Sequence, residues 1–134
     1  MTAAFDVPAT VESLDTVQDR FAAWWDDLGI DDVRLRFALE TAVAEIAANI
    51  VEHTLRTDQE AGRRYSVELD ATEHAVTAVL RDNGRPADVD LSAVTMADVD
   101  AESGRGLALA IAALDRLEHR HEDGHNVWTL VCAR

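Results

Sequence analysis

Three polar side chains recur at helical spacing within a mostly apolar segment, residues 42–54. Glu45, Asn49 and His53 follow one another at intervals of four residues. In an α-helix each such interval turns the side chain by only about 40°, so all three rise on one narrow stripe. The amide oxygen of Asn49 is a hard, neutral ligand that suits Mg²⁺, and Glu45 could accept a proton from an attacking hydroxyl. Alone, the pattern also fits an ordinary polar boundary of a core-facing helix.

Two glycine-containing turns further along the chain offer complementary chemistry. Asp82 comes just after the strand predicted at 75–80 and could accept the exocyclic amine of adenine, while Gly84 lets backbone approach the ring. Gly104, Arg105 and Gly106 open a predicted helix, whose N-terminus favours anions, and the arginine could contact a phosphate. Each turn alone is also an ordinary turn sequence. Together with the helical stripe, the two turns predict one nucleotide site.

Two further patterns give weaker indications of a functional site. His119, His121 and His125 have a spacing that resembles metal ligands, but no companion carboxylate or cysteine is evident and solvent-facing strand histidines are common. Cys132, the single cysteine, alternates within an apolar terminal strand without an activating group, so a nucleophilic role is not expected.

Length and composition narrow the class of protein. The 134 residues predict one domain, 1–134, and 48% of them are apolar, which suits a globular core. The net charge of −14 argues against direct nucleic-acid binding, and the absence of lysine excludes a P-loop. No apolar run is long enough for a membrane span and no secretory leader is visible, so a cytoplasmic domain is expected. A single cysteine agrees with a reducing compartment.

The hydrophobic pattern predicts an ordered series of elements. Thr10 is the expected N-cap of the first helix, Gly29 its stop, and Asp31 and Asp32 cap the second. The adjacent Trp24 and Trp25 predict that one lies in the core and the other at an interface or partly exposed. The expected elements are an edge strand at 3–8, helices at 11–28 and from 31 to about 55, a hairpin of 65–71 and 75–80, a long loop at 85–103, a helix at 107–117, and a hairpin of 118–122 and 126–133.

Strands joined by tight turns imply a mostly antiparallel sheet. The Asp123-Gly124 dipeptide is a strong hairpin signal for the final pair. The two long helices are separated by a short break and should pack as an antiparallel pair. The predicted fold is therefore α+β: a two-layer sandwich of a mostly antiparallel, mixed sheet with its helices on one face.

The motifs in this order resemble one known family. AVAEIAANIVEH, then LRDNGRPAD, then SGRGLALA, and an ending GHNVWTLV are together similar to the GHKL (histidine-kinase-like) ATPases, which have the Bergerat ATP-binding fold. Within that superfamily the chain looks most like the bacterial anti-sigma factor serine-protein kinases. The resemblance covers nearly the whole chain.

This resemblance implies a role for each motif. Asn49 would hold Mg²⁺ on the ATP phosphates, and Glu45 would act as catalytic base toward a protein serine. Asp82 would bind adenine in a pocket shaped by Gly84. The residues that would close a lid over the phosphates are those of the third motif: Gly104, Arg105 and Gly106. Such family members sequester a sigma factor, phosphorylate a small anti-anti-sigma antagonist, and are often homodimers.

Two other functions fit part of the pattern. The chain could be a regulatory module that binds a protein partner, with or without nucleotide, and does not turn over. It could also be the ATP-binding part of a histidine kinase, although no dimerising helix with a phosphoacceptor histidine precedes the domain. The intact pair of Glu45 and Asn49 favours the kinase over the non-catalytic module, because a binder needs no base.

Overall fold

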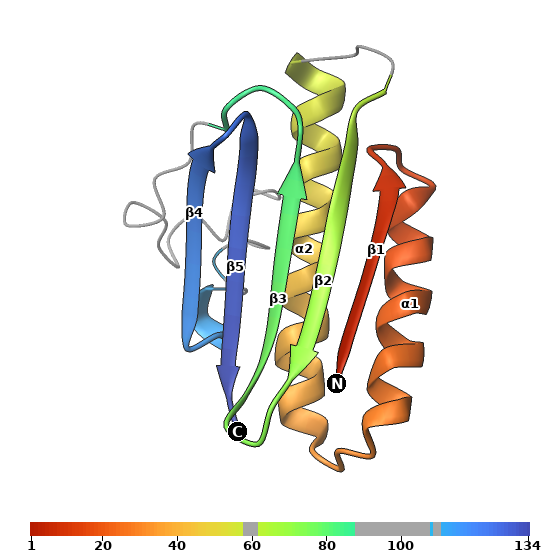
Figure 1. Ribbon diagram of the computed structural model, residues 1–134, viewed down its shortest axis with the longest axis vertical. Helices are drawn as coiled ribbons and strands as arrows, with labels where there is room; N and C mark the ends of the chain where they lie inside the picture. Colours follow the sequence, from red (N-terminus) through yellow and green to blue (C-terminus); the bar gives the residue numbers. More distant parts are fainter. Residues whose placement is uncertain (58–61, 88–107, 109–110) are drawn as a thin grey trace.

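The computed structural model contains a five-stranded sheet and two long helices (Figure 1), and it describes residues 1–57, 62–87, 108 and 111–134. The elements, in chain order, are β1 (Thr2–Pro8), α1 (Ser13–Leu28), α2 (Val33–Thr57), β2 (Arg64–Ala71), β3 (Ala75–Asp82), β4 (Arg116–Glu122) and β5 (His125–Ala133).

The strands are ordered β1-β2-β3-β5-β4 across the sheet, and each described pairing is antiparallel. The last strand of the chain, β5, therefore lies inside the sheet, between β3 and β4. In its register Asp82 faces Asn126, and Leu80 faces Trp128. Because residues paired in this way point to the same face, these four side chains share the helix side of the sheet.

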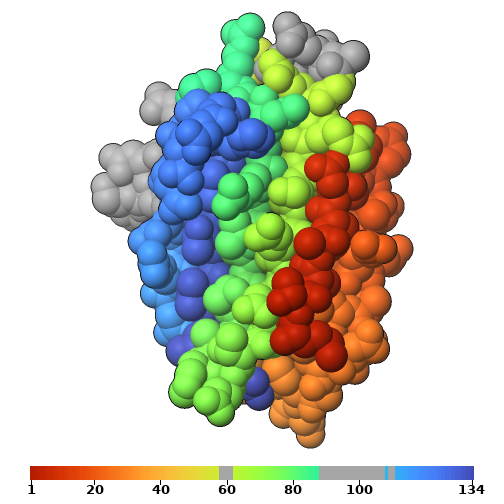
Figure 2. Space-filling model, in the orientation of Figure 1, coloured from red at the N-terminus to blue at the C-terminus, as the bar shows by residue number. Residues whose placement is uncertain are grey.

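Both helices cover one face of the sheet and run antiparallel to each other, while Figure 2 shows the other face with its strands side by side. Alternate strand residues and one stripe of each helix make the core, whose largest fully buried side chains include Phe21, Leu39, Ile46, Tyr65 and Leu80. The predicted α+β two-layer class is confirmed. Among the described helices, none is long and apolar enough to cross a membrane.

Helix and turn signals mostly act where the sequence places them. Gly29 ends α1 in the left-handed conformation, at φ 68°, and the Asp32 carboxylate accepts the Leu35 amide at 3.0 Å, which caps α2. The prediction of Thr10 as a side-chain N-cap is wrong. The N-cap position is Glu12, without a side-chain cap bond. The carbonyl of Thr10 instead accepts the Ser13 hydroxyl at 2.6 Å.

The tryptophan pair also corrects an expectation. Trp24 and Trp25 are each only 4% exposed, so neither is left for an interface. Their rings lie 6.0 Å apart and both contact Phe21. The indole N–H of Trp24 donates to the Met1 carbonyl at 3.3 Å, so the start of the chain lies next to this ring. Contacts with Phe21 and with the Met1 carbonyl therefore help to enclose both rings.

The C-terminal third begins differently from its prediction. Ala108 and residues 111–113 are helical, but β4 already starts at Arg116, so the expected helix does not extend to residue 117. The final hairpin is as predicted: Asp123 and Gly124 adopt φ values of 52° and 77°, as a tight two-residue turn requires. Most of the predicted long loop, and its weak turn at 93–99, lie outside the described residues.

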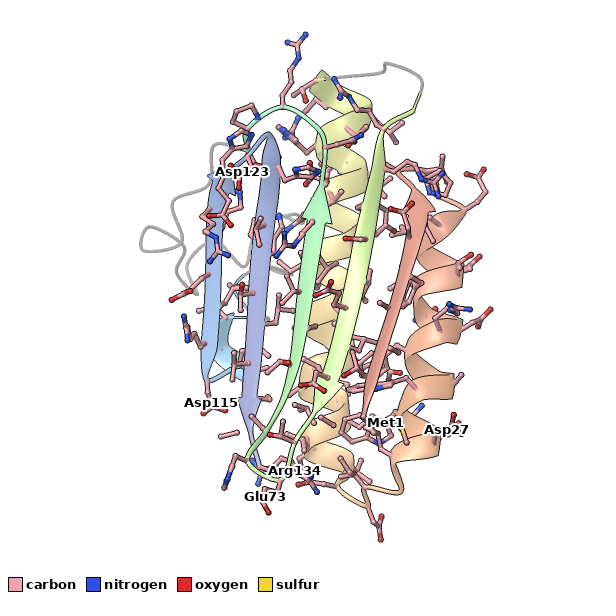
Figure 3. The ribbon with its side chains drawn as sticks, in the orientation of Figure 1. Met1, Asp27, Glu73, Asp115, Asp123 and Arg134 are labelled. Carbon is pink, nitrogen blue, oxygen red and sulfur yellow. The ribbon has the colours of Figure 1, made fainter. Side chains whose placement is uncertain are left out.

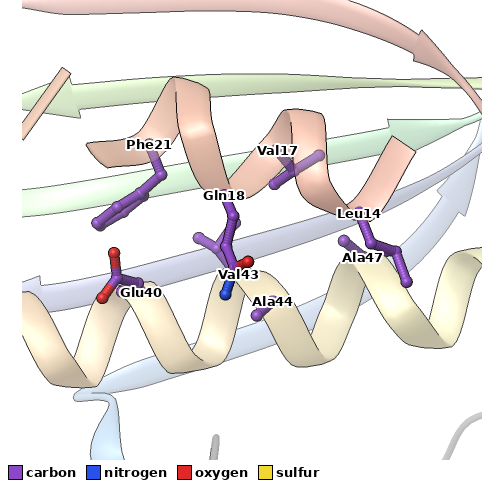
Figure 4. A pocket seen from close by; sticks show the side chains of 8 residues that line it. All are labelled: Leu14, Val17, Gln18, Phe21, Glu40, Val43, Ala44 and Ala47. Carbon is purple, nitrogen blue, oxygen red and sulfur yellow. The ribbon is translucent and has the colours of Figure 1, made fainter. Parts of the chain in front are cut away.

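A small apolar cavity separates the two helices (Figure 4). It has a volume of about 150 Å³ and is lined from α1 by Leu14, Val17, Gln18 and Phe21, and from α2 by Glu40, Val43, Ala44 and Ala47. The short side chains at positions 44 and 47 leave this space unfilled. The cavity also identifies the flank of α2 that packs on α1, which fixes the direction of the opposite flank.

Candidate functional site

Three segments far apart in the sequence meet at one end of the sheet. The C-terminal end of α2, the end of β3 and the start of β5 lie together there, beside the β4–β5 turn that Asp123 marks in Figure 3. The turn after β3, residues 83–87, connects them. This end of the sheet therefore collects the predicted Asp82 and Gly84 with the last residues of α2.

Asp82 is a buried carboxylate with one oxygen already engaged. Its side chain is 4% exposed. Its Oδ1 accepts the Gly84 amide at 2.9 Å and the Asn126 side-chain amide at 3.0 Å. The other oxygen, Oδ2, receives no hydrogen bond from the described part of the chain. Because Oδ1 is held in this way, Oδ2 is the oxygen that can accept a donor from a ligand, such as an exocyclic amine.

Gly84 serves the carboxylate through its lack of a side chain. A Cβ at this position would lie 3.1 Å from the Asp82 Oδ1 and 3.9 Å from the Thr54 hydroxyl. The first distance is closer than ordinary van der Waals contact, so a larger residue would displace the carboxylate. Glycine therefore allows the backbone to fold tightly over Asp82 and donate its amide to it.

The turn after β3 is held from two sides. The Asn126 side chain donates to the Arg85 carbonyl at 2.8 Å and accepts the Ala87 amide at 2.9 Å. His53, near the end of α2, donates from Nε2 to the same Arg85 carbonyl, at 3.1 Å. The histidine is thus a structural link between α2 and the turn.

Glu45 and Asn49 lie on the flank of α2 that faces away from α1. Both side chains are half-buried. Each is two residues from Ala47, which lines the cavity against α1. At about 100° per residue, that places both about 160° around the helix from Ala47. The predicted pair is therefore kept clear of the helix–helix interface.

The segment after the third motif reaches this same flank. Ala38 precedes Glu45 by seven residues, two turns of helix, and lines a hollow together with Ala112 and Ala113. Asn49 follows Ala38 by eleven residues, roughly 16 Å along the helix at 1.5 Å per residue, so this hollow lies against the N-terminal half of that flank. The third-motif residues themselves, Gly104, Arg105 and Gly106, lie outside the described residues.

The three C-terminal histidines are divided between the two faces of the hairpin. His119 and His121 share the helix side, whereas His125 points to the other face and contacts the Asp123 carbonyl at 3.0 Å. Within the described ranges, no three potential ligands group together as a metal site. Burial raises the pKa of the Cys132 thiol, with a smaller contribution from Asp115, and a raised pKa disfavours a nucleophilic thiolate.

Asn126 is the functional-site residue that the sequence reasoning missed. It is fully buried, and it connects Asp82, the turn after β3 and β4. A signal was present: the helix-facing positions of β5 are Asn126, Trp128, Leu130 and Cys132, so a carboxamide interrupts an apolar row. A polar residue at a core position of a strand indicates a specific partner.

A family model described as the histidine kinase-like ATPase domain matches residues 7–132. The chain belongs to this family. Histidine kinase-like ATPase domains bind ATP, usually with Mg²⁺, and Oδ2 of Asp82 is an acceptor of the kind that an adenine amine would need. Asn49 offers the oxygen that a magnesium ion would need.

Solved structures give the histidine kinase-like ATPase fold independent support. The crystal structure of the RsbU and RsbW domains of Rv1364c from Mycobacterium tuberculosis matches with a TM-score of 0.68 and 24% sequence identity. The match covers 100% of this chain and 33% of that one, so the chain spans about a third of its length. At this identity the likeness shows the fold alone. No curated protein matches the chain.

Proposed function

We propose that this domain is an ATP-dependent protein serine kinase and anti-sigma regulatory factor. It would phosphorylate a serine of a small anti-anti-sigma antagonist, and it would also sequester a sigma factor. The observation that carries the proposal is the division of α2 into two flanks. One flank packs on α1, and the other carries the half-buried Glu45 and Asn49.

Each residue has a role in this proposal that follows from its chemistry. Asp82 accepts the adenine amine with Oδ2, and Gly84 keeps the carboxylate in place. Asn49 would hold Mg²⁺ through its neutral amide oxygen, and the metal would partly neutralise the charge of the ATP phosphates. Glu45, one turn earlier, would accept the proton of the serine hydroxyl that receives the phosphoryl group, with ADP as the leaving group.

The phosphates would be held by the third motif. Gly104 and Gly106 have no side chains that would cover their backbone amides from an anion, and Arg105 would add a charged donor. This assignment suits a chain without lysine, because arginine and backbone amides must then supply the phosphate contacts.

The decisive experiment separates binding from transfer. Titration calorimetry with ATP, with and without Mg²⁺, is expected to show metal-dependent binding by the wild type and none by Asn49→Ala. Glu45→Ala is expected to bind normally but to transfer labelled phosphate to a purified antagonist much more slowly. Glu52→Gln is a matched control, because Glu52 is exposed on α2 and its described ion pair is with Arg56. Undiminished transfer by Glu45→Ala would rule out its role as base.

The alternative is a non-catalytic regulatory module that sequesters a protein partner. It predicts a different pattern in the same experiment: nucleotide bound, or not bound at all, with no transfer to any candidate antagonist. Binding of a sigma factor that is independent of Glu45 would then favour this alternative. Homodimerisation, which the resemblance also implies, would be measured by sedimentation of the same samples.

A further inference from the structure

The side chain of Asn126 uses its full hydrogen-bonding capacity around Asp82. Its amide nitrogen donates to Asp82 Oδ1 at 3.0 Å and to the Arg85 carbonyl at 2.8 Å. Its oxygen accepts the Ala87 amide at 2.9 Å and lies 3.1 Å from Nε2 of His119. A carboxamide offers two donors and two acceptor positions, so all four are used. This side chain is also fully buried.

We propose that Asn126 is the positioning residue that aims the adenine-reading carboxylate of Asp82, with His119 as its support on the neighbouring strand. The inference rests on the proposed nucleotide site and deepens it. It assigns base selectivity to a residue that would not itself touch the phosphates or the transferred group.

The orientation of the Asn126 amide is fixed by its surroundings. Asp82 Oδ1 and the Arg85 carbonyl are acceptors, so the nitrogen must face them. The Ala87 amide is a donor, so the oxygen must face it. The reversed orientation would place donor against donor or acceptor against acceptor at all three contacts. The Asn126 amide therefore has a single favourable orientation, and its hydrogen bond fixes the position of Asp82 Oδ1.

His119 holds this orientation from β4. Because Asn126 turns its oxygen toward the ring, Nε2 of His119 must carry a proton and donate it. The imidazole lies on Trp128, with ring centroids 4.4 Å apart and planes tilted by 45°. Trp128 is 2% exposed and belongs to the core, so it gives the histidine a rigid support.

The preference for adenine over guanine depends on which oxygen of the Asp82 carboxylate remains available to the base. With Oδ1 occupied by Gly84 and Asn126, Oδ2 is an acceptor that can pair with the 6-amino group of adenine. Guanine carries an oxygen at that position, and two acceptors facing each other in a buried site leave both unpaired. If Asp82 could rotate, either oxygen could move away and the discrimination would fall. Asn126 prevents that rotation.

The test compares the dissociation constants of Mg-ATP and Mg-GTP. In Asn126→Leu, which is similar in size and has no polar group, the preference for ATP is expected to fall about tenfold or more. His119→Phe, which keeps the ring on Trp128 but removes the donor, should lower the preference about threefold. His119→Gln, which restores a donor, should recover it. His121→Gln is the matched control, since His121 is exposed and faces Asn126 across the hairpin.

The possible outcomes distinguish the positioning role of Asn126 from the proposed binding of ATP. An unchanged preference for ATP in folded Asn126→Leu, or in His119→Phe if the leucine variant does not fold, would overturn the positioning role. Wild-type protein that binds neither nucleotide would overturn the proposed function and, with it, the reading of adenine. Hydrogen exchange of backbone amides then tests the hydrogen bonds of Asn126 without any nucleotide. The Ala87 amide should lose its protection from exchange in Asn126→Leu, and retained protection would refute the proposal that Asn126 holds the turn after β3.

Discussion

Replacing Asp82 with asparagine changes the group that would face adenine but keeps the two hydrogen bonds that the carboxylate makes within the protein. The remaining Oδ1 can still accept the Gly84 amide and the Asn126 side chain. These two donors determine the new amide's orientation, because the reverse would set donors against donors. The nitrogen of the new side chain must then take the place of Oδ2. Asp82→Asn therefore turns the one remaining acceptor into a donor.

The magnitude for Asp82→Asn follows from these contacts. Losing a hydrogen bond to a charged acceptor costs about 1.5–3 kcal/mol, and leaving a buried donor unpaired costs about 1–3 kcal/mol more. A total of about 3 kcal/mol or more raises the dissociation constant of Mg-ATP on the order of 100-fold. The unfolding free energy should change by less than about 1 kcal/mol, because both existing hydrogen bonds are kept.

Calorimetry with Mg-ATP and Mg-ITP, together with urea unfolding, measures both sides of this prediction. The base of ITP has an oxygen where adenine has its amine, so Asp82→Asn should bind ITP better relative to ATP than the wild type does. Glu68→Gln is the control, because it removes one charge from the exposed face of β2. Unchanged ATP affinity in a folded Asp82→Asn protein would refute the reasoning and place the adenine pocket elsewhere.

Three further changes test other contacts. Gly84→Ala puts a methyl group 3.1 Å from the Asp82 carboxylate, so Mg-ATP affinity should fall about fivefold by calorimetry, with little change in melting temperature. Ser13→Ala removes the buried partner of the Tyr65 hydroxyl, 2.6 Å away, and should cost about 1–3 kcal/mol in urea unfolding; adding Tyr65→Phe should recover part of the loss. Burial raises the pKa of Cys132, so the folded state keeps this proton to higher pH than the unfolded state does. Its contribution to stability is complete below about pH 8.5, the ordinary pKa of a thiol, and is lost as the pH rises above it; Cys132→Val should reduce that alkaline loss in pH-dependent unfolding.

The parts of the fold that the sequence predicted are those set by local chemistry. Gly29 and Asp32 end and begin helices through their own backbone and side-chain preferences, and Asp123-Gly124 makes a turn that few other pairs make as readily. The alternation of β2, β3 and β5 likewise reflects one buried face per strand. These signals act over a few residues, so they can be read without the tertiary structure.

The failures arise where distant contacts decide. Helical geometry predicted that Trp24 and Trp25 could not both be buried, but Phe21 and the first residue of the chain help enclose them. Within the candidate site, Asp82 and Gly84 were recognisable from their turn. Asn126 was not, since its significance depends on strand order, which brings it beside a carboxylate 44 residues earlier in the sequence.

The interior position of β5 has a kinetic consequence. Asp82 and Asn126 can meet only after β5 has inserted beside β3, which closes a long loop before the pairing can stabilise it. We therefore expect the site to form late, after the folding transition state. A nucleotide bound there would slow unfolding and leave the folding rate almost unchanged. The bound nucleotide would therefore lengthen the lifetime of the native domain without making the domain fold faster.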